Sequence, residues 1–253
     1  MNIINVIHAE WKKKYKTNGL LLGLAVLAPV LIQWAIYLSK WDAVKVDLST
    51  DGWMMHVGVL HTMVTQLLYP IVCIVLVFSD IQQENKADSW KVMYVLPIRK
   101  LYIALGKLIF LFAQAFVLLF AYAGLQVLSG FVVSGYLQPS DQWSDASLMQ
   151  ALEYMQLPRI GLYLCSLISL HLCLELFQRK GMAVLMLGLL SMVLLAPFSA
   201  YWSGFKWIPY TMISSMRLIE GDSSQLLSMD LAAWGYLLVF TGISCWWFDR
   251  RDL

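Results

Sequence analysis

Long apolar runs restrict the fold of this chain more than any other feature. Hydrophobic residues make up 60% of its 253 residues and charged residues only 13%, whereas soluble domains carry about a quarter charged residues. A helix of about 20 apolar residues crosses the roughly 30 Å hydrocarbon core of a membrane. We therefore predict an all-α polytopic membrane protein with six transmembrane helices, at residues 19–39, 54–78, 108–135, 160–177, 181–205 and 231–248.

The first 16 residues, MNIINVIHAEWKKKYK, place apolar side chains at every fourth position and end in a cluster of lysines. This pattern is typical of an amphipathic helix that lies at the membrane surface, so we predict an interfacial helix over 1–16. A frayed polar tail is the alternative. Because the sequence has neither an internal repeat nor a linker rich in Gly or Ser, we expect a single transmembrane domain over 1–253.

The two longest outer links carry weaker helical patterns. The link over 135–158 contains DQWSDASLMQALEYMQLP, which predicts an amphipathic surface helix. The link over 205–230 interleaves polar and apolar residues, and we expect short helices that dip into the outer leaflet.

The direction of insertion follows from the basic residues, which are enriched on the cytoplasmic side of membrane proteins. With the N-terminus inside, 13 Lys and Arg residues lie on the cytoplasmic side and five lie outside. We therefore expect a multi-pass protein of the bacterial cytoplasmic membrane with both termini in the cytoplasm. The five outer residues are Lys40, Lys45, Arg159, Lys206 and Arg217.

Several functions are disfavoured by what the sequence lacks. A nucleotide-binding P-loop requires GxxxxGK[ST], and the single Gly-Lys pair, Gly106-Lys107, is followed by Leu108. The net charge of +2 is too small to suggest a nucleic-acid partner. The four cysteines lie in apolar runs without the paired spacing of a disulfide framework or metal site, so we interpret them as packing residues. We expect no catalytic residue, no metal and no cofactor in this chain.

The segment ELFQR places Glu175 in the fourth predicted span. It contains ExxxR, a pattern found in some intramembrane proteases, but no histidine follows it that could help to activate water. Ionisable groups within a span are candidates for function, and His171 lies one helical turn before Glu175. We consider both residues possible points on a substrate path or a subunit seam. The alternative is that Glu175 simply pairs with Arg179, one turn later. His56 and His61 are expected near the outer face.

The most charged stretch, SDIQQENKADSWKVMYVLPIRKLYIALGKL at 79–108, joins the second and third spans. It carries acidic residues and a tryptophan in addition to the basic residues that topology requires. Such a mixture favours a docking surface, with Trp90, Met93 and Tyr94 as an apolar anchor and the surrounding charges setting orientation. A solvated loop that only enforces topology is the alternative.

This stretch resembles the segment between spans two and three of ABC-2-type transporter permeases. In those permeases the segment contains an early Glu, a Gly-Thr-like pair, a Pro followed by a basic residue, and a Gly-Lys that opens span three. In this chain they are represented by Glu84, Asp88-Ser89, Pro97 with Arg99, and Gly106-Lys107. Asp88 departs from the pattern, which has Gly there. The layout and size are similar to those of permeases from lantibiotic and other peptide-antibiotic immunity and export systems.

The resemblance implies a permease that exports an amphipathic or hydrophobic substrate such as a peptide antibiotic, a lipid or a drug. It also implies a second permease chain and two separate ABC ATPase subunits, which would hold the ATP and Mg. The ATPase interface would comprise Glu84, Asp88, Ser89, Trp90, Met93, Tyr94, Pro97 and Arg99. A different class of function, a non-transporting membrane scaffold or sensor that recruits a cytoplasmic partner through 79–107, is the alternative.

Overall fold

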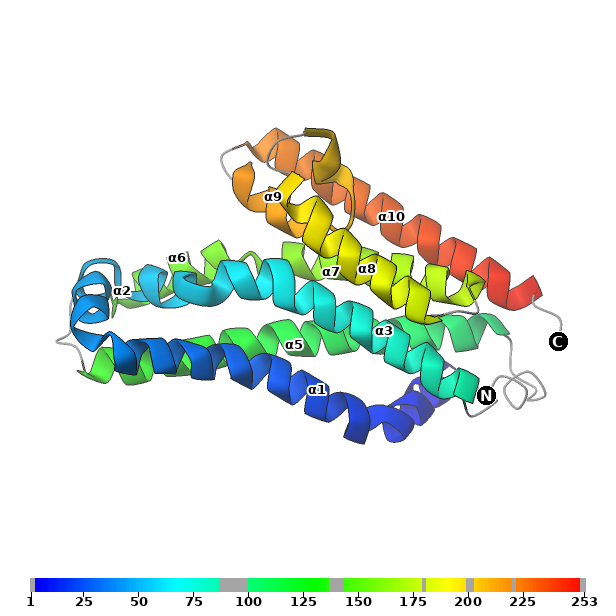
Figure 1. Cartoon of the computed structure of the whole chain (residues 1–253), viewed down its shortest axis with the longest axis horizontal. Coiled ribbons are helices and arrows are strands. Elements are labelled where there is room, and N and C mark those ends of the chain that lie inside the picture. The colour runs from blue at the N-terminus through cyan, green and yellow to red at the C-terminus, as the bar shows by residue number, and fades with distance from the viewer. Residues whose placement is uncertain are drawn as a thin grey trace.

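The computed structural model describes residues 3–86, 100–136, 143–178, 181–198, 203–219 and 222–250, and the regular elements in these ranges are all helices. The chain passes back and forth along an elongated bundle (Figure 1). The long elements are α1 (Ile3–Ser39), α2 (Trp41–Met63), α3 (Tyr69–Lys86), α5 (Lys100–Tyr136), α7 (Leu157–Phe177), α8 (Gly181–Phe198) and α10 (Ser223–Arg250). The shorter ones are the π turn η1 (Val64–Leu68), α6 (Asp145–Met155), the 3-10 turn η3 (Ser203–Trp207) and α9 (Met212–Leu218).

Five stretches of the described residues are long and apolar enough to cross a membrane, and each contains one predicted span. They are Asn18–Ser39, Trp41–Asn85, Lys100–Tyr136, Asp145–Phe177 and Ser223–Arg250. The predicted span 181–205 corresponds to α8, whose apolar part, Gly181–Leu195, is shorter. The all-helical fold is confirmed, and the count of six spans stays a prediction.

The N-terminal helix is longer than expected. Residues 3–16 do not form a separate element, since they are continuous with the first span in α1. The 37 residues of α1 measure about 55 Å at 1.5 Å per residue, which exceeds the roughly 30 Å of hydrocarbon. Trp11 is exposed by 56%, while Glu10 and Lys14 are buried against neighbouring helices. The position of this segment relative to the membrane surface stays a prediction.

The second predicted span is built from three elements in succession. Gly52, with φ of 47° and ψ of −117°, bends α2 in a conformation that glycine adopts readily. The π turn η1 then precedes Pro70. Because Pro70 has no N–H to donate to the carbonyl of Gln66, the helical hydrogen-bond ladder is interrupted there.

The links 135–158 and 205–230 contain short helices, as the sequence predicts, and their place relative to the membrane stays a prediction. The helix of the first link is α6, which begins after Ser144, whose hydroxyl accepts a hydrogen bond from the Ser147 N–H at 3.4 Å. The second link holds η3 and α9 as short helices. All four cysteines are free thiols, and three of them are buried.

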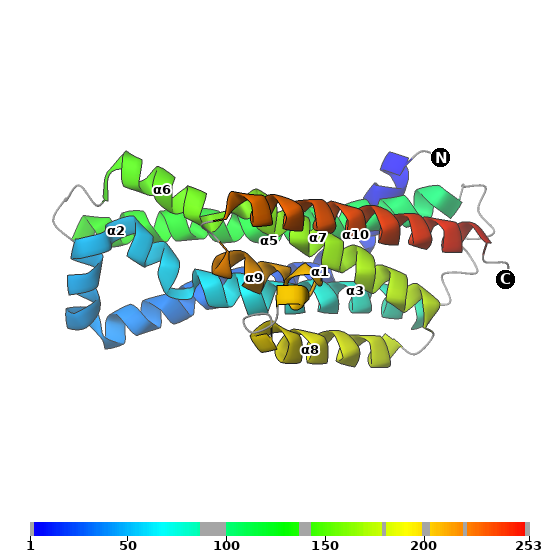
Figure 2. The same cartoon turned by 90° about the horizontal axis from the view of Figure 1, so that it is seen from above.

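The core lies between α3, α5 and α7, with α1 packed on α5 and α10 packed on α7. Figure 2 shows α8 at one edge of the bundle, where it contacts α3 and α7. The start of α1, the end of α3, the start of α5 and the end of α10 all lie at one end of the long axis (Figure 1). The described parts of the charged stretch, 79–86 and 100–108, therefore lie at the same end of the bundle as the first turns of α1 and the last turns of α10.

Candidate functional site

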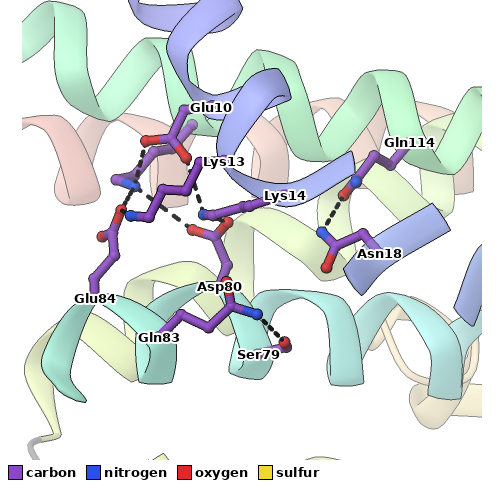
Figure 3. A network of polar contacts seen from close by, with 10 residues as sticks. Glu10, Lys13, Lys14, Asn18, Ser79, Asp80, Gln83, Glu84 and Gln114 are labelled. Atoms are coloured by element: carbon purple, nitrogen blue, oxygen red, sulfur yellow. Dashed lines mark hydrogen bonds and ion pairs between the residues drawn. The ribbon is translucent and has the colours of Figure 1, made fainter. Parts of the chain in front are cut away.

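Six charged side chains from three helices meet at this end of the bundle (Figure 3). We call them the charged cluster. Three are acidic and three are lysines, so their formal charges sum to zero. They are Glu10, Lys13 and Lys14 of α1, Asp80 and Glu84 of α3, and Lys107 of α5.

Lys107 contacts all three carboxylates of the charged cluster. Its Nζ donates a hydrogen bond to Glu10 Oε1 at 2.9 Å and another to Glu84 Oε1. It also forms an ion pair with Asp80 Oδ2 at 3.6 Å. One ammonium group from α5 thus joins α1 to α3.

Lys14 and Lys13 complete the charged cluster from α1. The Nζ of Lys14 lies 3.0 Å from Glu10 Oε2 and forms an ion pair with Asp80 Oδ1. The Nζ of Lys13 donates to Glu84 Oε1 at 3.1 Å. Lys13 is the most exposed member, with 36% of its side chain accessible, whereas the other five side chains are exposed by 7% or less.

Burial and the neighbouring charges shift the pKa values of Glu10 and Lys14. Burial disfavours the charged form of Glu10, but Lys107 and Lys14 together outweigh burial and lower the pKa of Glu10 from 4.5 to about 2. Burial and the nearby Lys107 lower the pKa of Lys14 to about 8, although Glu10 opposes that change. At neutral pH both side chains are therefore predominantly charged.

Local sequence spacing explains how the charged cluster forms. Glu10 and Lys14 are four residues apart on α1, and Asp80 and Glu84 are four residues apart on α3, so each pair lies on one helix face. Gly106 allows α1 to approach α5 closely, because a Cβ there would lie 2.7 Å from Val6 Cγ1.

The structure thereby explains the Gly-Lys pair of the sequence. Gly106 provides the close contact between α1 and α5, and Lys107 supplies the ammonium group at that contact.

The structure places Glu84 inside the bundle. We expected Glu84 at a cytoplasmic ATPase-docking surface, and its side chain is fully buried between Lys107 and Lys13; its part in docking stays a prediction. Asp80 and Lys107 are likewise inside the bundle and not in a loop, because α3 continues to Lys86 and α5 begins at Lys100. The other residues expected at the interface, Asp88, Ser89, Trp90, Met93, Tyr94, Pro97 and Arg99, lie outside the described residues.

The second pair of candidate residues, His171 and Glu175, is buried within this chain. The Nε2 of His171 is 2.8 Å from the Tyr210 hydroxyl. Gly188 of α8 faces the same imidazole, since a Cβ on Gly188 would lie 2.8 Å from Nε2. His171 therefore lies between α7, α8 and Tyr210.

Glu175 lies one turn further along α7, next to Gly181, the first residue of α8. A Cβ on Gly181 would lie 2.7 Å from Glu175 Oε2 and would also clash with Gln82 of α3. Neither carboxylate oxygen of Glu175 has a hydrogen-bond partner among the described residues, and Arg179, the partner expected from the sequence, lies outside them. Glu175 and His171 thus line a contact between helices of one chain, and their expected role in a substrate path or a subunit seam stays a prediction.

A buried polar network occupies the opposite end of the bundle. His56 is fully buried, and its Nδ1 lies 3.0 Å from the Tyr37 hydroxyl while Nε2 lies 3.1 Å from the Gln126 carbonyl. Gln33 donates to Tyr37 at 2.8 Å and accepts from the Gln126 amide at 2.8 Å. These bonds join His56 to α1 and α5, and its expected position near the outer face stays a prediction.

Sequence reasoning missed four members of the charged cluster: Glu10, Lys13, Lys14 and Asp80. The available signal was the four-residue spacing of charges on two helices that are otherwise largely apolar. Among the described residues, no group of His, Cys, Asp and Glu is arranged to hold a metal ion. The acidic groups of the charged cluster are neutralised by lysines instead.

Comparison with known proteins gives one family. The family model described as "ABC-2 family transporter protein" matches residues 6–212, which include the charged cluster, the segment 87–99 and α1 to α8. A search of curated proteins finds no match.

Proposed function

This chain belongs to the ABC-2 transporter family, and on that premise we propose that separate ABC ATPase subunits drive it as a permease that exports an amphipathic or hydrophobic substrate. Membership makes the chain a membrane-spanning permease subunit of an ABC transporter. The proposal adds the source of energy, the direction of transport and the class of substrate. A peptide antibiotic, a lipid or a drug fits that class.

The charged cluster is the observation that carries this proposal. The segment 87–99 follows the last residue of α3, Lys86, and precedes the first residue of α5, Lys100. The hydrogen bond from Lys107 to Glu84 joins α5 to α3 close to both ends of this segment. Glu10 and Lys14 tie the same site to α1. A force applied to the segment 87–99 is therefore delivered to three helices at once.

The segment 87–99 supplies the contact with the ATPase in this proposal. Trp90, Met93 and Tyr94 form its apolar anchor, because large side chains that fill a groove dominate the energy of most interfaces. Charged and turn-forming residues set the orientation of docking. These are Asp88, Ser89, Pro97 and Arg99.

The assembly we propose contains two ATPase subunits, which bind ATP and Mg, and two permease chains, identical or related. Both termini face the cytoplasm of a bacterial cell across its cytoplasmic membrane. The basic residues support this orientation, and the two ends of the chain lie at the same end of the bundle (Figure 1), which places them on one side of the membrane in this proposal. Cysteine labelling of intact cells should reach position 145 and should not reach position 85.

Trp90→Ala tests the proposed docking. Loss of an aromatic anchor costs about 2 kcal/mol or more of binding free energy, which lowers affinity by roughly 30-fold. The permease, with its native partners, is purified in detergent, and the recovered ATPase and its activity are measured. Trp234→Ala is the matched control, since Trp234 is an exposed tryptophan of α10.

Two outcomes contradict parts of the proposal. Equal ATPase recovery with Trp90→Ala and Trp234→Ala would show that the segment 87–99 is not the docking surface. Recovery of a stoichiometric partner that is not an ATPase would favour the scaffold or sensor function.

A further inference from the structure

A groove of about 410 Å³ lies between α1 and α5, in addition to the charged cluster. Its lining is apolar apart from Gln114 and includes Gly19, Gly23, Phe110 and Val117. The Gln114 amide oxygen already accepts a hydrogen bond from Asn18 Nδ2 at 3.3 Å. The groove therefore suits an apolar occupant.

The two glycines leave this groove open. A Cβ added to Gly19 or Gly23 would meet no atom within 4 Å. Gly106, by contrast, is needed for the contact between α1 and α5. The GxxxG spacing at residues 19–23 is thus not used for packing within this chain, although such spacing permits close approach in membranes.

The groove opens toward the side of the bundle that faces hydrocarbon. Leu20, Leu24 and Leu27 of α1 and Val117 of α5 are exposed large apolar residues beside it or along it. In a membrane-spanning segment these side chains contact lipid. An occupant of the groove can therefore enter directly from the bilayer.

One end of the groove carries the signature of a membrane–water interface. Trp11 lines this end and is 56% exposed, with its ring 6.4 Å from that of Phe110. Tryptophan is enriched at the level of lipid headgroups. The next residue, Lys12, is exposed and precedes the span that begins at Asn18. A cation beside an interfacial tryptophan complements an anionic headgroup.

The apolar part of the groove matches one leaflet. Its lining on α1 runs from Trp11 to Leu27, about 24 Å of helix at 1.5 Å per residue. With the headgroup at Trp11, the part from Gly19 to Leu27 covers about 12 Å, close to the roughly 15 Å that is half of the hydrocarbon core. We propose that the groove binds one acyl chain of an anionic phospholipid from the leaflet on the side of the N-terminus, with its headgroup at Trp11 and Lys12. This lipid site is independent of the proposed transport and of any ATPase.

Native mass spectrometry tests the lipid site. The full-length chain, purified with any subunits that accompany it, is mixed with equal amounts of phosphatidylglycerol and phosphatidylcholine. We expect one tightly retained phosphatidylglycerol, and at least a ten-fold loss of its occupancy in Gly23→Leu, because the new side chain fills the groove. Gly235→Leu is the matched control, since a Cβ on Gly235 of α10, like one on Gly23, would meet no atom within 4 Å.

Lys12→Gln separates the headgroup contact from the acyl-chain contact. We expect the preference for phosphatidylglycerol over phosphatidylcholine to fall about five-fold, the equivalent of about 1 kcal/mol for one basic residue near a membrane surface. Phosphatidylcholine should still be retained. If Gly23→Leu lowers thermal stability, Gly19→Leu repeats the test from the other glycine.

Two results would overturn this inference. One is equal lipid retention in the wild type, Gly23→Leu and Gly19→Leu. The other is efficient disulfide formation between two Gly23→Cys chains in vesicles, which would assign the groove to a helix of a second copy.

Discussion

Replacing Lys107 by methionine tests the charged cluster most directly. Methionine keeps much of the length and apolar character of the lysine side chain but removes the ammonium group that contacts Glu10, Asp80 and Glu84. Three carboxylates then face only Lys13 and Lys14, which leaves one uncompensated negative charge. Since four of these five side chains are exposed by 7% or less, water does not compensate it.

The expected loss follows from the cost of stranding a buried charge. Removing one partner of a buried ion pair costs about 3–5 kcal/mol, and a charge pair 4 Å apart near a protein surface is worth about 4 kcal/mol. For a chain of this size about 1 kcal/mol corresponds to roughly 2–4 °C in melting temperature. We therefore expect Lys107→Met to lower the melting temperature by about 6–20 °C.

A second substitution distinguishes charge balance from packing. Lys107→Met combined with Glu84→Gln restores a net charge of zero, and Lys13, which loses its partner, is accessible enough to be hydrated. The double variant should be more stable than Lys107→Met alone, with a coupling energy of about 2 kcal/mol or more.

Melting temperatures are compared in detergent at one fixed scan rate, because membrane proteins often unfold irreversibly. Lys45→Met, at an exposed lysine of α2, is the control for the chemistry of the substitution. A Lys107→Met protein as stable as Lys45→Met, or a double variant that shows the simple sum of the two single losses, would contradict a charge-balanced cluster.

Two further predictions concern α8 and pH. Gly188→Ala should destabilise the chain by about 1–3 kcal/mol, because the new Cβ would lie 3.2 Å from Ile74 Cγ2 and closer still to His171. Adding His171→Ala to this variant should recover part of the lost stability in thermal unfolding. No recovery would contradict the contact between Gly188 and His171. The pKa of Glu10 is lowered from 4.5 to about 2 in the folded chain, so its stabilising contribution is fully present above pH 4.5 and is lost as pH falls toward 2. The difference in melting temperature between wild type and Glu10→Gln should shrink over that interval, and a constant difference would contradict the lowered pKa.

The long apolar runs predicted the helices well because their physical constraint is local. A run such as 19–39 or 108–135 has few ways to satisfy its backbone in a membrane other than as a helix, and both runs lie within single helices of the structure. The surface helix α6 was also predictable, because its pattern spans only 11 residues and needs no distant partner.

The sequence could not show that helices continue into the charged stretch. Charged residues normally mark the end of a span, and Asp80, Glu84 and Lys107 were therefore assigned to a loop. Within α3 and α5 they are neutralised by partners that lie far away in sequence: Lys107 and Glu10, for example, are separated by 97 positions. Periodicity identifies residues that share a helix face, but it does not identify which faces meet.

The charged cluster limits how α1, α3 and α5 can move. If α3 shifted relative to α5, Glu84 would separate from Lys107, and two buried charges would lose their mutual compensation at several kcal/mol. If α1 stayed behind, Glu10 and Lys14 would lose Lys107 and Asp80 in the same way. Lys13 is accessible enough for water to replace its lost partner. The other five members are nearly inaccessible, so water does not offset their losses. A displacement that begins in the segment 87–99 is therefore favoured to carry the three helices together, and Lys107→Met should uncouple this motion even where the protein still assembles.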